Sequence, residues 1–98
     1  MARILRTDAA LSDIASIAEY IAADNLPAAD RWIEQIDSTV RLLARFPAIG
    51  QRVEHLGAGL RRYCLHNYLI FYRPIDRGIE LRRVLHGARQ IEDLFHDE

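Results

Sequence analysis

Three neighbouring stretches decide the fold: LRRYCLH at residues 60–66, YLIFYR at residues 68–73 and GIELRRVLH at residues 78–86. They are rich in aromatic, β-branched and leucine residues, a composition that favours strands. Only short polar links separate them, and residues 74–78, which begin with Pro and end with Gly, suit a hairpin connection. We therefore predict a three-stranded antiparallel meander.

The alternation within these stretches indicates which side chains share a face. Because a regular strand alternates with a period of two, Tyr68, Ile70 and Tyr72 are expected on one face. The third stretch breaks this rule, since Leu81 and Val84 lie three residues apart. This spacing predicts either a β-bulge or burial on both faces.

Two amphipathic helices are expected before the strands. Residues 9–23 and residues 28–45 each place apolar side chains on one stripe with a helical period. Residues 24–27, Asp-Asn-Leu-Pro, interrupt the pattern with turn formers and a proline suited to an early helical position. Such a short connection predicts an antiparallel helical hairpin.

Shorter elements flank these two blocks. Residues 2–6 are expected to form a first strand, with Thr7 or Asp8 available to cap the following helix. Residues 88–95 favour a short last helix. The order β-α-α-β-β-β-α predicts one α+β domain over residues 1–98, in which the helical hairpin packs on a small antiparallel sheet.

The charge of the chain is unevenly distributed. All 13 basic residues are arginine, and the absence of lysine excludes chemistry that depends on a lysine base or Schiff base. Residues 50–89 hold eight Arg against three acidic residues, a balance of +5, whereas residues 90–98 hold four acidic residues and no Arg. Arginine suits bidentate contact with carboxylate or phosphate. The basic block is therefore interpreted as a binding surface, although exposed salt bridges on a solvated face are the alternative.

The sequence offers little for catalysis or for binding a metal or cofactor. Cys64 and His66 would share a strand face, but their spacing matches no closed zinc pattern. There is no glycine-rich phosphate loop in a strand-to-helix setting, and no serine in a nucleophile context. We expect no cofactor, no metal and no catalytic residue.

Cytoplasmic localisation is expected from three features. The single cysteine cannot form an internal disulfide, which fits a reducing compartment. The first residues lack the apolar core of a signal peptide, and no apolar run is long enough for a membrane span.

The candidate partner-binding surface interleaves arginines with tyrosines on the predicted strands. This mixture is typical of interface hot spots and can also hold RNA phosphates and stack bases. About half of the four tyrosines are expected in the core, with a satisfied hydroxyl. Together with an apolar edge of the last helix, the candidates are Arg61, Arg62, Tyr63, Tyr68, Tyr72, Arg73, Arg82, Arg83, His86, Arg89, Leu94 and Phe95.

Several motifs resemble the RelE/ParE toxin superfamily, and its ParE branch most of all. They are GLRR at residues 59–62, YLIFYR at 68–73, RVLHGAR at 83–89, YIAADNLPAA at 20–29 and LARFPAIG at 43–50. The resemblance covers nearly the whole chain and agrees with the predicted element order. One departure is Gln90, where many relatives carry an aspartate.

The resemblance implies a toxin of a bacterial type II toxin–antitoxin pair. A cognate ParD-like antitoxin, with a ribbon-helix-helix DNA-binding N-terminus, would neutralise it by folding a disordered C-terminal segment across the toxin. The +5 block beside apolar and aromatic residues predicts that this segment is acidic and amphipathic and covers the sheet and the helical hairpin. The free toxin would trap DNA gyrase on cleaved DNA and would not itself be an enzyme. Neither a membrane partner nor sequence-specific nucleic-acid binding by the toxin alone is expected.

Two alternatives remain open. A RelE-like, ribosome-dependent mRNA endonuclease needs a base, an acid and a cation, for which Arg61 or Arg83 could supply charge and His86 or Tyr63 could move protons. The lack of lysine and a pI of about 6.4 are unfavourable for docking into ribosomal RNA. The other alternative is an inactive relic that only binds its antitoxin.

Overall fold

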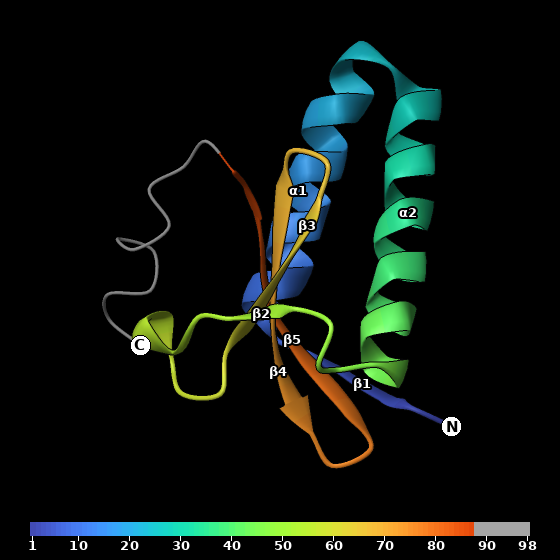
Figure 1. Ribbon diagram of the computed structural model, residues 1–98. Coiled ribbons are helices and arrows are strands. Elements are labelled where there is room, and N and C mark those ends of the chain that lie inside the picture. Colours follow the sequence, from blue (N-terminus) through green and yellow to red (C-terminus); the bar gives the residue numbers. More distant parts are fainter. Residues whose placement is uncertain (88–98) are drawn as a thin grey trace.

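Two long helices lie against a five-stranded sheet in the computed structural model, which describes residues 1–87 (Figure 1). The elements are β1 (Arg3–Arg6), α1 (Asp8–Asp24), α2 (Leu26–Arg45), β2 (Gln51–Arg52), a 3-10 turn (Glu54–Leu56), β3 (Arg61–Leu65), β4 (Tyr68–Ile75) and β5 (Gly78–His86). The α+β class, the helical hairpin and the three-stranded meander are confirmed. The last helix predicted for residues 88–95 lies outside the described residues.

The sheet is mixed, which differs from the purely antiparallel sheet that we expected. Its strand order is β1-β5-β4-β3-β2, with β1 parallel to β5 and every other pair antiparallel. No hairpin joins β1 to β5, so the direction of β1 is not fixed by a tight turn as it is in the meander. The two-residue edge strand β2 was not predicted, because its polar residues, Gln51 and Arg52, carry no apolar alternation.

A β-bulge in β5 explains the irregular spacing of its apolar residues. The register between β4 and β5 shifts between Phe71 and Tyr72, which leaves Arg82 without an opposite residue on β4. The extra residue brings both Leu81 and Val84 into the core beneath the helices. The bulge predicted from their spacing is confirmed.

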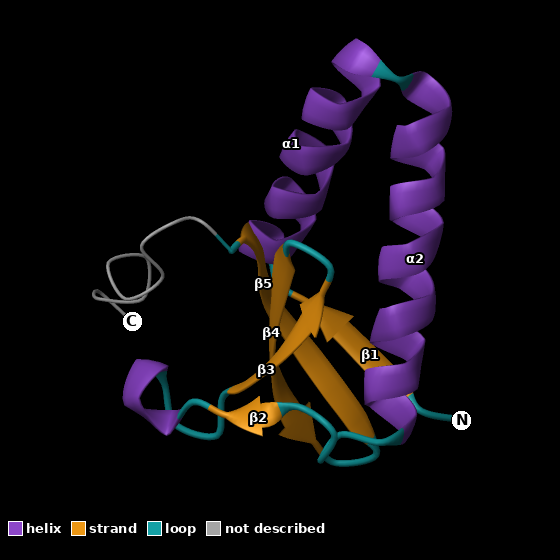
Figure 2. Cartoon of the chain, turned by 45° about the horizontal axis from the view of Figure 1, so that its top comes forward, coloured by secondary structure: helices purple, strands orange, loops and turns teal. Residues whose placement is uncertain are grey.

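The helical hairpin turns on a single residue, Asn25. Its backbone N–H donates to the Ile21 carbonyl at 2.8 Å and ends α1, while its Oδ1 accepts from the Ala28 N–H at 3.0 Å and begins α2. Thr7 caps α1 as expected, since its Oγ1 accepts the Ala10 N–H at 3.1 Å. The turn at Asn25 stands clear of the strands in both views (Figures 1 and 2).

The main core lies between the helices and one face of the sheet. From α2 it takes Trp32, Ile36, Val40, Leu43 and Ala44. The helix α1 contributes less, because only Ala10 is buried and its other apolar residues are partly exposed. On the opposite face, a smaller cluster forms from Val53, Leu60, Phe71 and Leu85. The apolar residues of α1 other than Ala10 therefore remain partly exposed to solvent.

Candidate functional site

An ion pair between Asp13 and Arg83 fastens α1 to β5. Arg83 Nε donates to Asp13 Oδ2 at 2.7 Å and Arg83 Nη2 donates to Oδ1 at 3.0 Å, a bidentate arrangement. The Val84 N–H also donates to Asp13 Oδ2, at 3.0 Å. The side chains of Arg83 and Asp13 are only 19% and 12% exposed. Arg83, a candidate for partner contact, is thus held by a carboxylate of its own chain.

Tyr72, another candidate, lies in the core. Its hydroxyl donates to the Pro47 carbonyl at 2.7 Å and accepts the Gly50 N–H at 2.8 Å, and none of the residue is exposed. Burial raises the pKa of Tyr72, although the Gly50 hydrogen bond and the positive charge of Arg61 oppose this. The structure assigns Tyr72 to packing rather than to direct contact with a partner.

Arg61 belongs to the same network. Its Nη1 donates to the Gly50 carbonyl at 2.6 Å and to the Ala48 carbonyl at 3.3 Å. Together with Tyr72, Arg61 therefore fixes the loop that joins α2 to β2. The loop presents Phe46 and Ile49, which are about half exposed.

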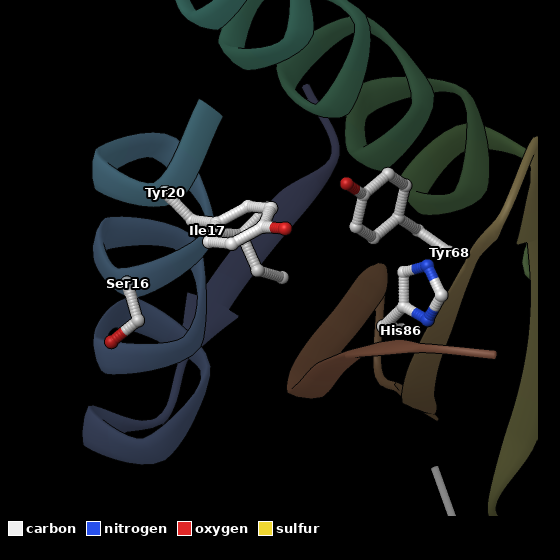
Figure 3. A pocket seen from close by; sticks show the side chains of 5 residues that line it. All are labelled: Ser16, Ile17, Tyr20, Tyr68 and His86. Atoms are coloured by element: carbon white, nitrogen blue, oxygen red, sulfur yellow. The ribbon is translucent and has the colours of Figure 1, made fainter. Parts of the chain in front are cut away.

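A cavity of about 370 Å³ opens between α1 and the ends of β4 and β5. Its lining residues are Ser16, Ile17, Tyr20, Tyr68 and His86 (Figure 3). Tyr68 is supported from two sides, because its ring packs edge-on against Trp32 with 5.2 Å between centroids and against His86 with 5.5 Å. Tyr20 extends from α1 toward the opening and is 81% exposed. The cavity therefore has a fixed wall on the sheet and an exposed aromatic side chain on the helix.

Tyr68 and His86 were among the candidates from the sequence, but Tyr20 was not. Tyr20 stands one helical step after Ile17, next to the apolar stripe of α1. This position was the signal that could have identified it.

Further apolar surface continues along the hairpin. A depression of about 200 Å³ has a lining that includes Leu11, Ile14 and Ile33, and Leu11 and Ile33 are 49% and 43% exposed. Ile14 and Ile17 of α1 pack partly against the main core, and Leu11 and Tyr20 lie exposed on opposite flanks of the helix, because nine residues make two and a half turns. We call the side of the hairpin lined by Leu11, Ile14 and Ile33 the hairpin surface.

The remaining candidates are distributed over both faces of the sheet. Tyr63 is partly buried against the main core. Arg62 Nη2 donates to Gln51 Oε1 at 2.9 Å, Arg73 Nε donates to the Ala58 carbonyl at 3.0 Å, and Arg82 pairs with Glu80 at 3.2 Å. Arg89, Leu94 and Phe95 lie outside the described residues. The candidates therefore do not form one surface.

No metal site or membrane span is found in the described part of the chain. Cys64 is exposed and His66 lies in the β3–β4 turn. Within residues 1–87, no three His, Cys, Asp or Glu side chains gather in a group suited to a metal ion. The helices of this region also lack the combination of length and apolar character that a bilayer span needs.

Comparison with known proteins gives consistent matches. The family model described as ParE toxin of type II toxin-antitoxin system, parDE, matches residues 4–91. Toxin ParE1 of Caulobacter vibrioides is 33% identical over 57 residues, which cover 58% of this chain and 58% of that toxin. Toxin ParE3 of the same organism is 25% identical over 92 residues, which cover 93% of this chain and 92% of that toxin.

A solved structure supports the fold. A chain of the chromosomal ParDE TA system from P. aeruginosa matches with a TM-score of 0.73 and 19% identity, covering 88% of this chain and 96% of that one. The resemblance inferred from the sequence motifs is confirmed by the family match.

Proposed function

Because this chain belongs to the ParE toxin family of type II toxin–antitoxin systems, we propose that it poisons DNA gyrase and is neutralised by a ParD-like antitoxin. The observation that carries the proposal is the exposed apolar surface on both flanks of α1, at the hairpin surface and at the cavity with Tyr68 and His86. Exposed apolar surface of this kind commonly marks a site of protein–protein interaction. This surface suits a segment that folds as it binds.

The proposed antitoxin segment is amphipathic. An apolar face of a helix can pack against α1 beside the exposed Tyr20, with one side chain entering the cavity of about 370 Å³. A disordered segment can cover a large area of this kind, at the cost of ordering itself on binding. Neutralisation by such a segment follows if its presence on α1 prevents the toxin from reaching its target.

Two contacts support action by binding rather than by cleaving RNA. The nuclease hypothesis needs Arg83 or Arg61 as a cation for the developing phosphate charge. Arg83 is held by Asp13, and Arg61 donates to two backbone carbonyls. Both guanidinium groups are therefore engaged by groups of their own chain, which does not favour a role in binding a substrate phosphate.

A gyrase cleavage assay tests the proposed function. Purified protein is incubated with gyrase, ATP and supercoiled plasmid, and the DNA is examined after detergent and protease treatment. We expect linear DNA that requires both gyrase and this protein. The absence of linear DNA, with gyrase active and the protein folded, would reject gyrase poisoning and lead to a ribosome-dependent mRNA cleavage assay.

A further inference from the structure

We propose that the outer edge of β1 binds an acidic, extended segment of the antitoxin, which adds a strand to the sheet beside β1. The inference rests on the proposed function and deepens it. It gives the antitoxin a second contact besides the helical hairpin, and it states the sequence pattern that this contact recognises.

The backbone of β1 is open along one side. β1 is the outermost strand on the side of the N-terminus, and within residues 1–87 no strand pairs with its outer edge (Figure 2). Arg3 and Thr7 donate their N–H groups inward, to carbonyls of β5 at 2.8 and 3.1 Å. Since the backbone groups of successive residues in a strand point to alternate edges, those of Ile4 and Arg6 point outward. An extended peptide can therefore form main-chain hydrogen bonds to these two residues.

The side chains of β1 offer the same kinds of contact on both faces of the sheet. Ile4 packs partly against the main core, and Arg6 lines the depression of the hairpin surface, so both turn toward the helices. Arg3 and Leu5 therefore lie on the opposite face, where both are exposed. Each face of the edge thus presents one guanidinium group and one apolar side chain.

This edge adjoins a depression at each of its ends. At the C-terminal end of β1, Arg6 shares a depression with the hairpin surface, so the edge is continuous with the surface on the helices. At the other end, Ala2 lines a groove of about 520 Å³ together with Arg45 and Phe46. Within residues 1–87, no acidic residue lines this groove. A segment bound on the hairpin can therefore continue along β1 into a basic and apolar groove.

The arginines favour an acidic segment over a second copy of this chain. Pairing of two β1 strands would bring four guanidinium groups onto one short seam, and like charges on neighbouring strands destabilise a sheet. An acidic strand instead gains charge-assisted contacts with Arg3 and Arg6. The acidic residue nearest to Arg6 in the hairpin depression, Asp37, is already paired with Arg41 at 2.7 Å.

The order of side chains along β1 defines the matching pattern. Residues opposite each other on neighbouring strands share a face, so opposite charges and apolar side chains can be paired one by one. The pattern opposite Arg3–Arg6 is acidic, apolar, apolar, acidic. It reads the same in both directions, so it holds for a parallel or an antiparallel added strand.

The first experiment uses a synthetic peptide with Glu-Val-Val-Glu between Gly-Ser flanks, and a control peptide with Lys-Val-Val-Lys at the same place. Isotope-labelled toxin is titrated with each peptide to millimolar concentration and followed by NMR. We expect the acidic peptide to shift the amide signals of Ile4 and Arg6 and to slow their hydrogen exchange. Exchange at Leu5, whose N–H points toward β5, should not change. If the acidic peptide affects Ile4 and Arg6 no more than the lysine peptide does, the inference is overturned.

The second experiment separates the backbone contact from the charge. Arg6→Pro removes the outward N–H and leaves the pairing with β5 intact, since proline is tolerated on the open side of an edge strand. Arg6→Gln removes the same charge but keeps the N–H. By calorimetry, we expect Arg6→Pro to bind the antitoxin about three- to tenfold more weakly than Arg6→Gln, as for the loss of one hydrogen bond. Equal affinity of the two variants, with thermal unfolding showing both folded, would speak against an added strand and reject the inference.

A charge reversal gives a measurement that does not depend on proline. Arg3→Glu should weaken antitoxin binding about fivefold relative to Arg31→Glu, which makes the same change at an exposed position of α2. Equal affinity of these two variants would likewise contradict an acidic strand at this edge.

Sedimentation of the free toxin tests a second copy as the occupant. We expect a monomer. A dimer that Arg6→Pro dissociates would overturn the inference and assign the edge to self-association. If the wild type does not bind the antitoxin, the proposed neutralisation fails, and the peptide titration alone decides whether the edge binds an acidic strand. The cleavage assay tests gyrase poisoning independently of this edge.

Discussion

A single carboxylate, that of Asp13, accepts three hydrogen bonds from β5. The β1 strand ends at Arg6, and beyond it no strand within residues 1–87 pairs with the outer edge of β5. Thr7 and Asp13 cover this edge, since Thr7 Oγ1 donates to the Arg82 carbonyl at 2.9 Å and Asp13 accepts the Val84 N–H. The N-cap residue and a side chain of α1 thus satisfy backbone groups on this edge of β5.

Removing the Asp13 carboxylate should therefore destabilise the protein. Asp13→Ala removes the carboxylate that accepts three hydrogen bonds from the mostly buried Arg83 and from Val84, and we expect a loss of about 3 kcal/mol in the free energy of unfolding. Asp13→Asn keeps an acceptor for the Val84 N–H and should lose less. Urea unfolding of both variants measures the difference. Equal stability of Asp13→Ala and the wild type would show that the pair contributes nothing.

Tyr72→Phe should cost about 1–3 kcal/mol, since it removes two hydrogen bonds and leaves the Gly50 N–H and the Pro47 carbonyl unpaired. The effect depends on pH. Because the pKa of Tyr72 is raised above 10.0, the folded protein holds this proton more tightly than the unfolded chain does. The stabilisation of the folded protein by the protonated Tyr72 hydroxyl is fully present below pH 10.0. It is lost as the pH rises through the pKa of Tyr72 in the folded protein.

Denaturation of the wild type and of Tyr72→Phe at pH 7 and at about pH 11 tests both effects. The wild type should lose its advantage over the variant as the solution becomes alkaline. A constant difference between the two proteins across this range would show that Tyr72 does not titrate with unfolding.

The parallel strand β1 depends on one glycine of β5. Arg3 lies opposite Gly78, and its N–H donates to the Arg77 carbonyl at 2.8 Å. A methyl group at Gly78 would collide with the backbone of Arg3. Backbone atoms cannot move aside as the end of a long side chain can, so the close approach of β1 requires glycine at this position.

Gly78→Ala should consequently displace β1 from the sheet. We expect a loss of about 1–3 kcal/mol in stability, typical of overpacking in a tight site. Amide hydrogen exchange should become faster for β1, while the β3–β4 hairpin keeps its protection. Gly57→Ala is the control, because a methyl group there meets only Leu60 at an ordinary 3.6 Å. Unchanged exchange in β1 would contradict the assigned role of Gly78.

The exposed apolar residues of the molecule are concentrated on the N-terminal strand, the two helices and the loop after α2. None of the large exposed apolar residues lies between residues 51 and 87. Apolar contact depends weakly on salt. Binding of the antitoxin to the helical hairpin should therefore change little with ionic strength.

Tyr20→Ala should weaken the complex with the antitoxin by about 2 kcal/mol, since an aromatic side chain beside a preformed cavity is a typical hot spot. Stability should hardly change, because Tyr20 is 81% exposed. Calorimetry at two salt concentrations measures the affinity, with Arg31→Ala on the exposed side of α2 as the control. Unchanged affinity for Tyr20→Ala would remove the cavity from the antitoxin interface.

Sequence patterns predicted the individual elements well. Apolar periodicity placed both helices, Thr7 was one of two predicted caps, and the spacing of Leu81 and Val84 indicated a bulge as one of two explanations. These features depend on residues close together in the chain. The parallel pairing of β1 was not predicted, because its partner lies more than seventy residues away by register, from Arg3 to Gly78.

The sequence by itself determined the α+β class, the helical hairpin, the meander and the family, all of which follow from local periodicity and motifs. Only the tertiary structure decided the role of each polar side chain. Arg83 and Arg73 look alike in the sequence, yet Arg83 pairs with Asp13 of α1 while Arg73 donates to the Ala58 carbonyl. Electrostatic interactions depend on distance in space rather than along the chain. The partner of a charged side chain therefore cannot be assigned until the fold is known.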